Sequence, residues 1–220
     1  MDLFYPAGCV ACLDRQATHH SVCTPCWDEA TNQTPFISTV ERFPCPPLVA
    51  SRPYDETASR LIGAYKEESR REVASVIAQA MRPAAALATQ ALSELGRELV
   101  FMPIPSTVAA RKRRGFDHMH LIATQLAAAS GNVPIQPSLL QVSAREDSVG
   151  LTIPQRLRAA QKSMSINPQR LATRERSGAV VVLLDDVVTT GATISAATNQ
   201  LNTAGIEVAG AVVFAAAGAA

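Results

Sequence analysis

Two adjacent carboxylates, Asp185 and Asp186, follow an aliphatic run at residues 181–184. They lead directly into a turn that opens a helical segment and consists of Val188, Thr189, Thr190, Gly191, Ala192 and Thr193. Free backbone N–H groups and the positive end of the helix dipole favour a phosphate there, and the threonine hydroxyls can donate further hydrogen bonds. The carboxylates can accept hydrogen bonds from ribose hydroxyls. The pattern therefore predicts a phosphosugar site at the carboxyl end of a buried strand.

Four of the five cysteines form two CxxC pairs, Cys9 with Cys12 and Cys23 with Cys26. Two such knuckles are typical of a closed, structural Zn²⁺ site. Two disulfides are the alternative, but they require an oxidising compartment and no export signal is visible. We expect the intervening His19 and His20 to be surface residues and Cys45 to be an unreactive thiol.

A basic run at residues 111–114 follows a short apolar segment. Solvated loop charge, a pyrophosphate site and a nucleic-acid contact are all compatible with it. Its place directly after a core strand favours pyrophosphate, with Arg111 and Arg114 as the ligands. We expect the nearby His118 and His120 to lie on the surface.

The elements that must position these residues alternate between helices and strands. Periods of three and four predict a helix over 57–81 with a break near 66–71, ended by Pro83, and a second helix over 84–95. The further expectations are a strand at 99–104, a basic loop, a helix at 118–130 capped by Asp117, a strand at 139–144, a helix at 154–161, a strand at 179–184, a turn at 185–192, a helix at 193–204 and a strand at 208–214. Strands without alternation, joined by helices, indicate an α/β fold with a mostly parallel sheet.

Composition narrows the function classes further. The 220 residues are 47% hydrophobic and 5% aromatic, and the formal net charge is +1. Near-neutral charge argues against a globally basic nucleic-acid coat, and few aromatic residues argue against an extended base-stacking surface. The longest apolar run is too short to cross a bilayer, so we expect no membrane insertion and a cytoplasmic location.

The stretch at residues 181–193 closely resembles the phosphoribosyl-pyrophosphate (PRPP) motif of type I phosphoribosyltransferases. The two CxxC pairs, Lys66, and the Arg114-Gly115-Phe116 segment extend this resemblance to the ComF family. The resemblance implies a type I phosphoribosyltransferase-like sheet flanked by helices at 48–220 and a small zinc ribbon-like module at 1–35.

The resemblance also implies an activity: transfer of a phosphoribosyl group to an unknown acceptor, with pyrophosphate release. Asp185 and Asp186 would be catalytic, the turn at 188–193 would bind the 5′-phosphate, and Mg²⁺ would accompany PRPP. A mobile loop near 145–158 would contribute Arg145 and Arg156. The alternatives are a non-enzymatic competence protein for DNA uptake, which binds single-stranded DNA and a helicase-type partner, and a PRPP-sensing partner protein.

Overall fold

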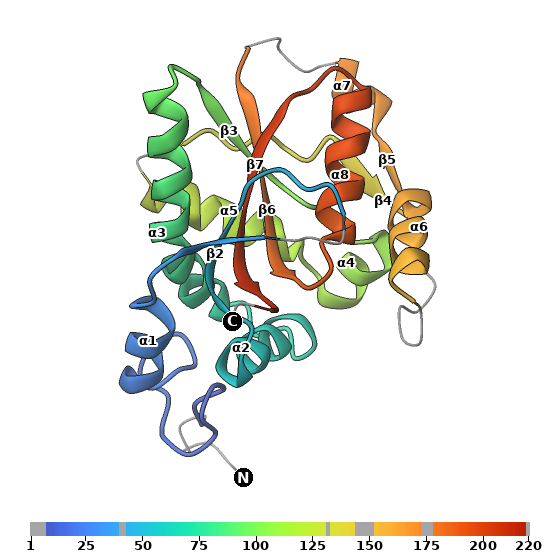
Figure 1. The fold of residues 1–220 in the computed structure, drawn as a ribbon. Helices are drawn as coiled ribbons and strands as arrows, with labels where there is room; N and C mark the ends of the chain where they lie inside the picture. The colour runs from blue at the N-terminus through green and yellow to red at the C-terminus, as the bar shows by residue number, and fades with distance from the viewer. Residues whose placement is uncertain (1–7, 40–42, 131–132, 144–151, 173–177, 219–220) are drawn as a thin grey trace.

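A five-stranded sheet lies at the centre of the computed structural model, which describes residues 8–39, 43–130, 133–143, 152–172 and 178–218 (Figure 1). The strand order is β1-β2-β7-β6-β3. These strands are β1 (Phe36–Ser38), β2 (Leu48–Pro53), β3 (Leu99–Pro103), β6 (Val180–Val188) and β7 (Val208–Ala216). Within this sheet, β1 is antiparallel to its neighbour and the other strands are parallel. The predicted α/β class with a mostly parallel sheet is therefore confirmed.

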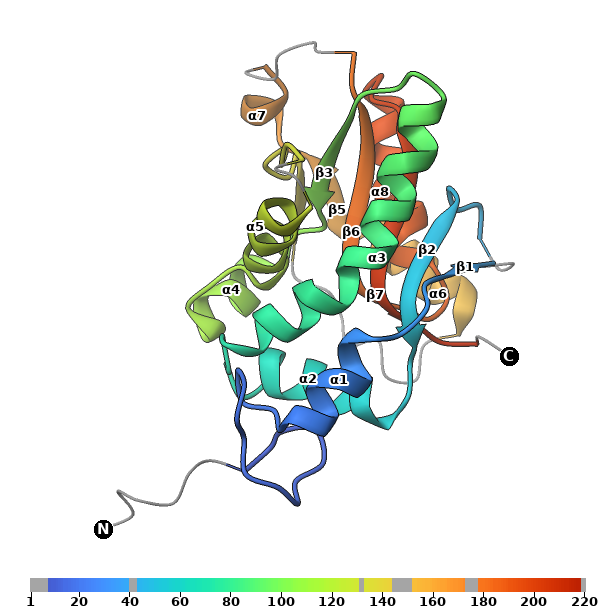
Figure 2. The same cartoon turned by 90° about the vertical axis from the view of Figure 1, so that its left-hand side faces the viewer.

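Helices cover both faces of this sheet (Figures 1 and 2). On one face lie α3 (Val73–Glu94) and α5 (His118–Ala129), and on the other lies α8 (Ala192–Thr203), which packs against α6 (Ile153–Ser163). In β6, Val182 and Leu184 join the apolar cluster with α3, whereas Val181 and Leu183 join the cluster with α8. Burial on both faces explains why the strand sequences show no polar alternation.

Shorter elements complete the described structure. They are α1 (Thr24–Thr31), α2 (Glu56–Lys66), α4 (Val108–Arg114), α7 (Pro168–Ala172), and a separate antiparallel pair of β4 (Leu140–Val142) with β5 (Met164–Ile166). The predicted break between two helices near residues 66–71 is confirmed, because α2 ends at Lys66 and α3 begins at Val73.

Three sequence-based boundaries were wrong. Pro83 lies inside α3, which continues to Glu94, because buried residues on both sides of it pack onto the sheet and offset the cost of an interior proline. β6 does not end before the carboxylates but runs to Val188, since its pairing with β7 continues past them. The basic loop is helix α4, capped by the Thr107 hydroxyl, which accepts from the Ala110 N–H at 3.1 Å.

The cysteine segment and α1 pack onto α2 and α3, and share one apolar cluster with them. A buried charge ties α1 to the sheet. The Arg52 guanidinium on β2 is fully buried and donates to Glu29 of α1 at 2.5 Å and to Asp55 at 2.7 Å. These hydrogen bonds and charges hold the pKa of Arg52 above its usual value, although burial acts in the opposite direction.

We expect the double substitution Glu29→Gln/Asp55→Asn to lower the free energy of unfolding by about 3 kcal/mol, because it leaves a buried guanidinium without a counter-ion. The Asp55→Asn change keeps a side-chain oxygen that can cap α2. Urea unfolding at pH 7 measures the effect. Glu56→Gln is the control, since Glu56 forms an exposed i,i+4 pair with Arg60 that is worth roughly 0.5 kcal/mol or less. A double variant as stable as this control would contradict the expectation.

Candidate functional site

The two carboxylates extend beyond the neighbouring strand β3, and this exposes them to a cavity. Pro103, the last residue of β3, pairs with Leu184, and the Ile104 N–H donates to the Leu184 carbonyl at 2.9 Å. Asp185 and Asp186 come next along β6 and face the segment after β3. The cavity holds about 350 Å³ and is lined by Lys66, Ile104, Pro105, Ser106, Thr107, Ala110, Arg114, His118, Val142, Asp185, Asp186, Val187, Thr189 and Thr193. Its position is the usual ligand site of an open α/β sheet.

Asp186 is buried and receives two basic side chains on one carboxylate oxygen. Lys66, the last residue of α2, forms an ion pair with Oδ2, and His118 Nε2 lies 3.0 Å from the same atom. Burial alone would raise the pKa of Asp186, but the charge of Lys66 and the hydrogen bond from His118 lower it well below its ordinary value. Burial alone would lower the pKa of Lys66, but the charge of Asp186 and the hydrogen bond to it raise that pKa above its ordinary value. Asp186 is therefore ionised at neutral pH.

His118 connects Asp186 to the segment after β3. Its Nδ1 lies 2.6 Å from Ser106 Oγ and 3.2 Å from Arg114 Nη1. Arg114 Nη1 also donates to Ser106 Oγ at 3.1 Å, and Arg114 Nε donates to the Lys66 carbonyl at 3.1 Å. A proton on Nε2 of His118 suits the partners of both ring nitrogens. Nε2 then donates to the Asp186 carboxylate, while Nδ1 accepts from Ser106 or Arg114. One hydrogen-bonded network thus fixes the carboxylate and the arginine in the same cavity.

The turn after β6 forms a small, polar hollow at the start of α8. Residues 187–194, together with Asp185, enclose about 40 Å³. Gly191 adopts φ 76°, a left-handed conformation that glycine takes without strain, and it precedes the first residue of α8. The Thr190 hydroxyl accepts from the Ala192 N–H at 3.4 Å. Val188, Thr189, Thr190, Gly191, Ala192 and Thr193 all line this hollow, which has the size and donors for one phosphate group.

Cys45 lies behind this turn. Its thiol is half-buried and donates to the Gly191 carbonyl at 3.5 Å. Burial raises its pKa, so the thiol stays protonated at neutral pH. This environment agrees with the expectation of an unreactive cysteine.

The structure separates the two arginines that the sequence grouped together. Arg114 lines the cavity with the carboxylates, whereas Arg111 lines a neighbouring cavity on the other side of α4. Arg145 lies outside the described residues. Arg156 belongs to α6, but its side chain is outside the described part of the structure.

The four cysteine thiols meet in one cluster. Their sulfur atoms all lie within 4.8 Å of one another, and Cys12 Sγ is 3.9 Å from Cys23 Sγ. Four sulfurs around a tetrahedral Zn²⁺ at 2.3 Å would be about 3.8 Å apart, so this donor set fits the ion. All five cysteines are free of disulfides. The cluster could therefore bind a metal such as zinc, and the disulfide alternative is wrong for this structure.

Two thiols of the cluster have pKa values shifted in opposite directions. A hydrogen bond from the Asp14 backbone lowers the pKa of Cys12 to about 6, against the effect of burial, while burial raises the pKa of Cys26. His19 and His20 are exposed and lie against the ring of Trp27, with ring centroids 5.9 and 5.7 Å from it. Both histidines lie outside the cysteine cluster, as expected.

Sequence reasoning missed two residues of the carboxylate site. Lys66 supported the family resemblance but was given no role, and His118 was wrongly expected on the surface. His118 is buried because it shares the inward face of α5 with Met119, Ile122 and Leu126. The spacing of four between His118 and Ile122 was the signal that could have placed it there. His120, in contrast, is exposed as expected.

The fold and the site together define an α/β protein in which a carboxylate pair lies next to a small polar hollow, at the carboxyl-terminal ends of the parallel strands. The chain belongs to the phosphoribosyl transferase domain family, whose family model matches residues 76–220. A comparison with curated proteins found no match. Among the described residues, no helix has the length and apolar character needed to cross a membrane.

Proposed function

We propose that this protein binds PRPP and transfers its phosphoribosyl group to an acceptor, with release of pyrophosphate. One observation carries the proposal: Asp185, Thr189 and Thr193 line both the carboxylate cavity and the phosphate-sized hollow, which makes the two spaces neighbours. A ribose 5-phosphate has the same order of groups. Its phosphate would lie at residues 188–193, and its hydroxyls would donate hydrogen bonds to Asp185 and Asp186.

The chemistry required of the side chains is electrostatic. When the bond between the anomeric carbon and pyrophosphate breaks, positive charge develops on the ribose ring and negative charge on the leaving group. Asp185 and Asp186 would stabilise the ring, while Arg114 and Lys66 would offset the charge of pyrophosphate. Because Asp186 is already ionised and held by His118, its orientation would need little rearrangement. Mg²⁺, bound with PRPP, would neutralise part of the pyrophosphate charge.

The proposal extends to the cysteine module and to the basic residues outside the carboxylate cavity. The cysteine cluster would hold a structural Zn²⁺ at Cys9, Cys12, Cys23 and Cys26, within a module at residues 1–35 that precedes a transferase domain at 48–220. This organisation supports membership of the ComF group. Arg145, and Arg156 of α6, would contribute to PRPP binding as the basic residues of the mobile segment that the family resemblance implies. The competence alternative, with single-stranded DNA and a helicase-type partner, rests on exposed basic residues such as Lys112 and Arg113.

Calorimetric titration of PRPP with Mg²⁺ into the zinc-loaded protein tests the proposal. We expect wild-type protein to bind and Thr193→Asp to lose at least tenfold in affinity, because a carboxylate would occupy the phosphate hollow. An acid in the first turn of α8 also suits the helix dipole, so this variant should fold. Asn199→Asp adds the same charge at an exposed position of α8 and should bind like wild type. Absence of binding, or equal loss in both variants, would refute the proposal.

A further inference from the structure

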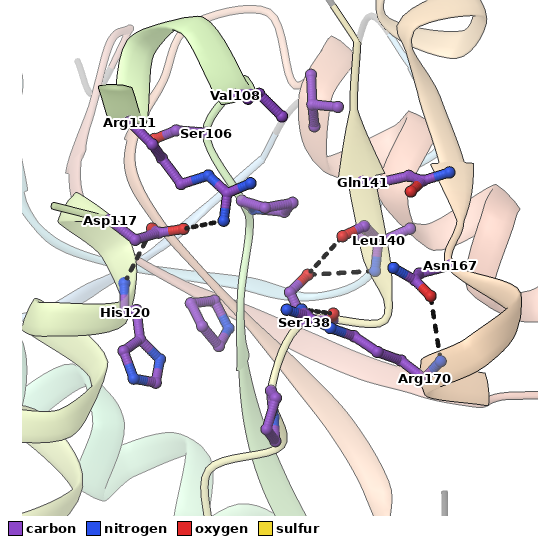
Figure 3. A pocket seen from close by; sticks show the side chains of 14 residues that line it. Ser106, Val108, Arg111, Asp117, His120, Ser138, Leu140, Gln141, Asn167 and Arg170 are labelled. Atoms are coloured by element: carbon purple, nitrogen blue, oxygen red, sulfur yellow. Dashed lines mark hydrogen bonds and ion pairs between the residues drawn. The ribbon is translucent and has the colours of Figure 1, made fainter. Parts of the chain in front are cut away.

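A second cavity adjoins the carboxylate site and contains none of its acidic residues (Figure 3). It holds about 300 Å³ and lies between α4, the start of α5, the β4–β5 pair and α7. Pro105, Ser106 and Val142 line both cavities and form the wall between them. Ligands in the two spaces would therefore be neighbours without sharing a site.

Two arginines give this cavity an excess of positive charge. Arg111 from α4 and Arg170 from α7 reach toward it from opposite sides (Figure 3). Among the described residues that line it, the single carboxylate is Asp117, whose Oδ1 caps α5 by accepting from the His120 N–H at 3.4 Å. Its Oδ2 lies 3.9 Å from Arg111 Nη1, which is too long for a hydrogen bond. The positive end of α5 adds to the same field.

Arg111 is not satisfied by its neighbours. Its Nε is buried and has no hydrogen-bond partner among the described residues. A buried donor without a partner carries a free-energy cost of about 1–3 kcal/mol. The Arg111 side chain as a whole is 42% exposed, so the outer part of its guanidinium is open to an anionic ligand. Arg170 is held in place, since its Nη1 donates to the Ser138 carbonyl at 2.6 Å and its backbone N–H donates to Asn167 Oδ1 at 3.1 Å. One arginine thus has bonding capacity to offer, and the other is anchored.

Part of the remaining wall is apolar and rigid, and the rest carries neutral polar side chains such as Gln141 and Asn167. Pro103, Pro105 and Pro137 restrict the backbone, and Leu140 and Val142 are buried. Val108, at the start of α4, stays 53% exposed at the rim, although burial against a ligand would be favourable. The combination suits a ligand with one anionic group and one apolar or planar group. The cavity volume of about 300 Å³ is near the lower limit for small-molecule sites, so the apolar group of the ligand can be no larger than a single ring system.

We propose that the cavity between Arg111 and Arg170 is a second ligand site, which takes a phosphate monoester of a planar or apolar group, the chemistry of a mononucleotide. The phosphate contacts Arg111 and Arg170, and the ring lies against Val108 and the prolines. This site is distinct from the proposed PRPP site, because Arg111 and Arg170 do not line the carboxylate cavity.

Equilibrium dialysis of the full, zinc-loaded chain with adenosine 5′-monophosphate, and separately with inorganic phosphate, tests this proposal. We expect wild-type protein to bind two equivalents of the nucleotide. Arg111→Met/Arg170→Met should weaken one of them at least tenfold and leave the other. Thr193→Asp should show the reverse, because it blocks only the hollow at residues 188–193. Inorganic phosphate should give the same pattern with weaker binding, since it lacks the ring.

Lys112→Met/Arg113→Met is the matched control. It removes the same two charges, from exposed positions of the same helix, and should change both affinities less than twofold. If the double arginine variant does not fold, Arg111→Met alone should still weaken one equivalent. One equivalent in the wild type that Thr193→Asp abolishes would overturn the second site and leave the PRPP proposal intact. One equivalent in the wild type that only the Arg111 variants abolish would support the second site and overturn the proposed phosphate site at residues 188–193.

Discussion

Replacing Lys66 by methionine should lower the free energy of unfolding by about 3 kcal/mol at pH 7. The reason is that the variant leaves Asp186 buried and without its cation, and removal of one partner from a buried pair costs about 3–5 kcal/mol. The stem of methionine fills much of the space of the lysine stem, so the change is chiefly one of charge. Urea unfolding monitored by circular dichroism measures the loss.

The same variant should show a reversed response to acid. In the wild type the pKa of Asp186 is lowered, so the stabilisation is present above the ordinary value of 3.8 and is lost as the pH falls through the folded-state value. Without Lys66, burial becomes the stronger influence and raises that pKa above the ordinary value. The variant carboxylate then takes up a proton more readily on acidification. The stability difference between the two proteins should therefore shrink as the pH falls from 7 toward 4.

Lys112→Met provides the control for Lys66→Met, because Lys112 is exposed and its removal should cost no more than roughly 0.5 kcal/mol. A constant difference between wild type and Lys66→Met across this pH range would mean that the ion pair with Asp186 does not determine the charge of the site. Equal stability of Lys66→Met and Lys112→Met at pH 7 would mean that the ion pair between Lys66 and Asp186 does not stabilise the fold.

Cys23→Ser should abolish stoichiometric zinc binding and unfold the segment around α1. Cys23 is almost fully buried and directly precedes α1, and serine is a poor ligand for zinc. Structural zinc contributes about 10–16 kcal/mol of apparent binding free energy in small modules, so its loss should exceed what residues 8–31 gain from packing. A colorimetric zinc assay on the denatured protein gives the metal content. Hydrogen exchange of α1 amides gives the unfolding.

Cys45→Ser should retain one zinc per chain and protected α1 amides, because Cys45 contacts the turn after β6 and lies outside the cysteine cluster. A Cys23→Ser protein that keeps a full equivalent of zinc would show that the four thiols do not form the metal site. Unchanged exchange in α1 without zinc would show that packing on α2 and α3 suffices to fold the segment.

Sequence patterns predicted the order of the main elements, because apolar periodicity reports which faces are buried. They also predicted that Asp185, Asp186 and the turn at residues 188–193 lie side by side, since these residues are contiguous. The end of β6 was placed too early because a charged residue normally marks the surface. Here the backbone continues to pair with β7 while the two carboxylates turn toward the cavity. Side-chain chemistry and backbone pairing gave conflicting signals at that point.

The polar network around Asp186 could not be predicted in the same way. Lys66 belongs to α2, Ser106 to the segment after β3 and Arg114 to α4. Only Arg114 is close to His118 along the chain, whereas Lys66 is 52 residues away. Only the packing of α2 beneath the edge of the sheet unites them. Lys66 also lies outside residues 76–220, so a family match restricted to that range contains one partner of the ion pair and not the other.

The position of β7 bears on how the chain folds as it is synthesised. β7 lies between β2 and β6, yet it is the last strand of the sheet to leave the ribosome. Until residues 208–216 emerge, β2 and β6 each lack a neighbour on one side, and their unpaired backbone groups can bind other chains. At roughly 5–20 residues per second, the interval between β2 and β7 lasts on the order of ten seconds or more. Nascent chains of this protein should therefore depend on chaperones until β7 closes the sheet.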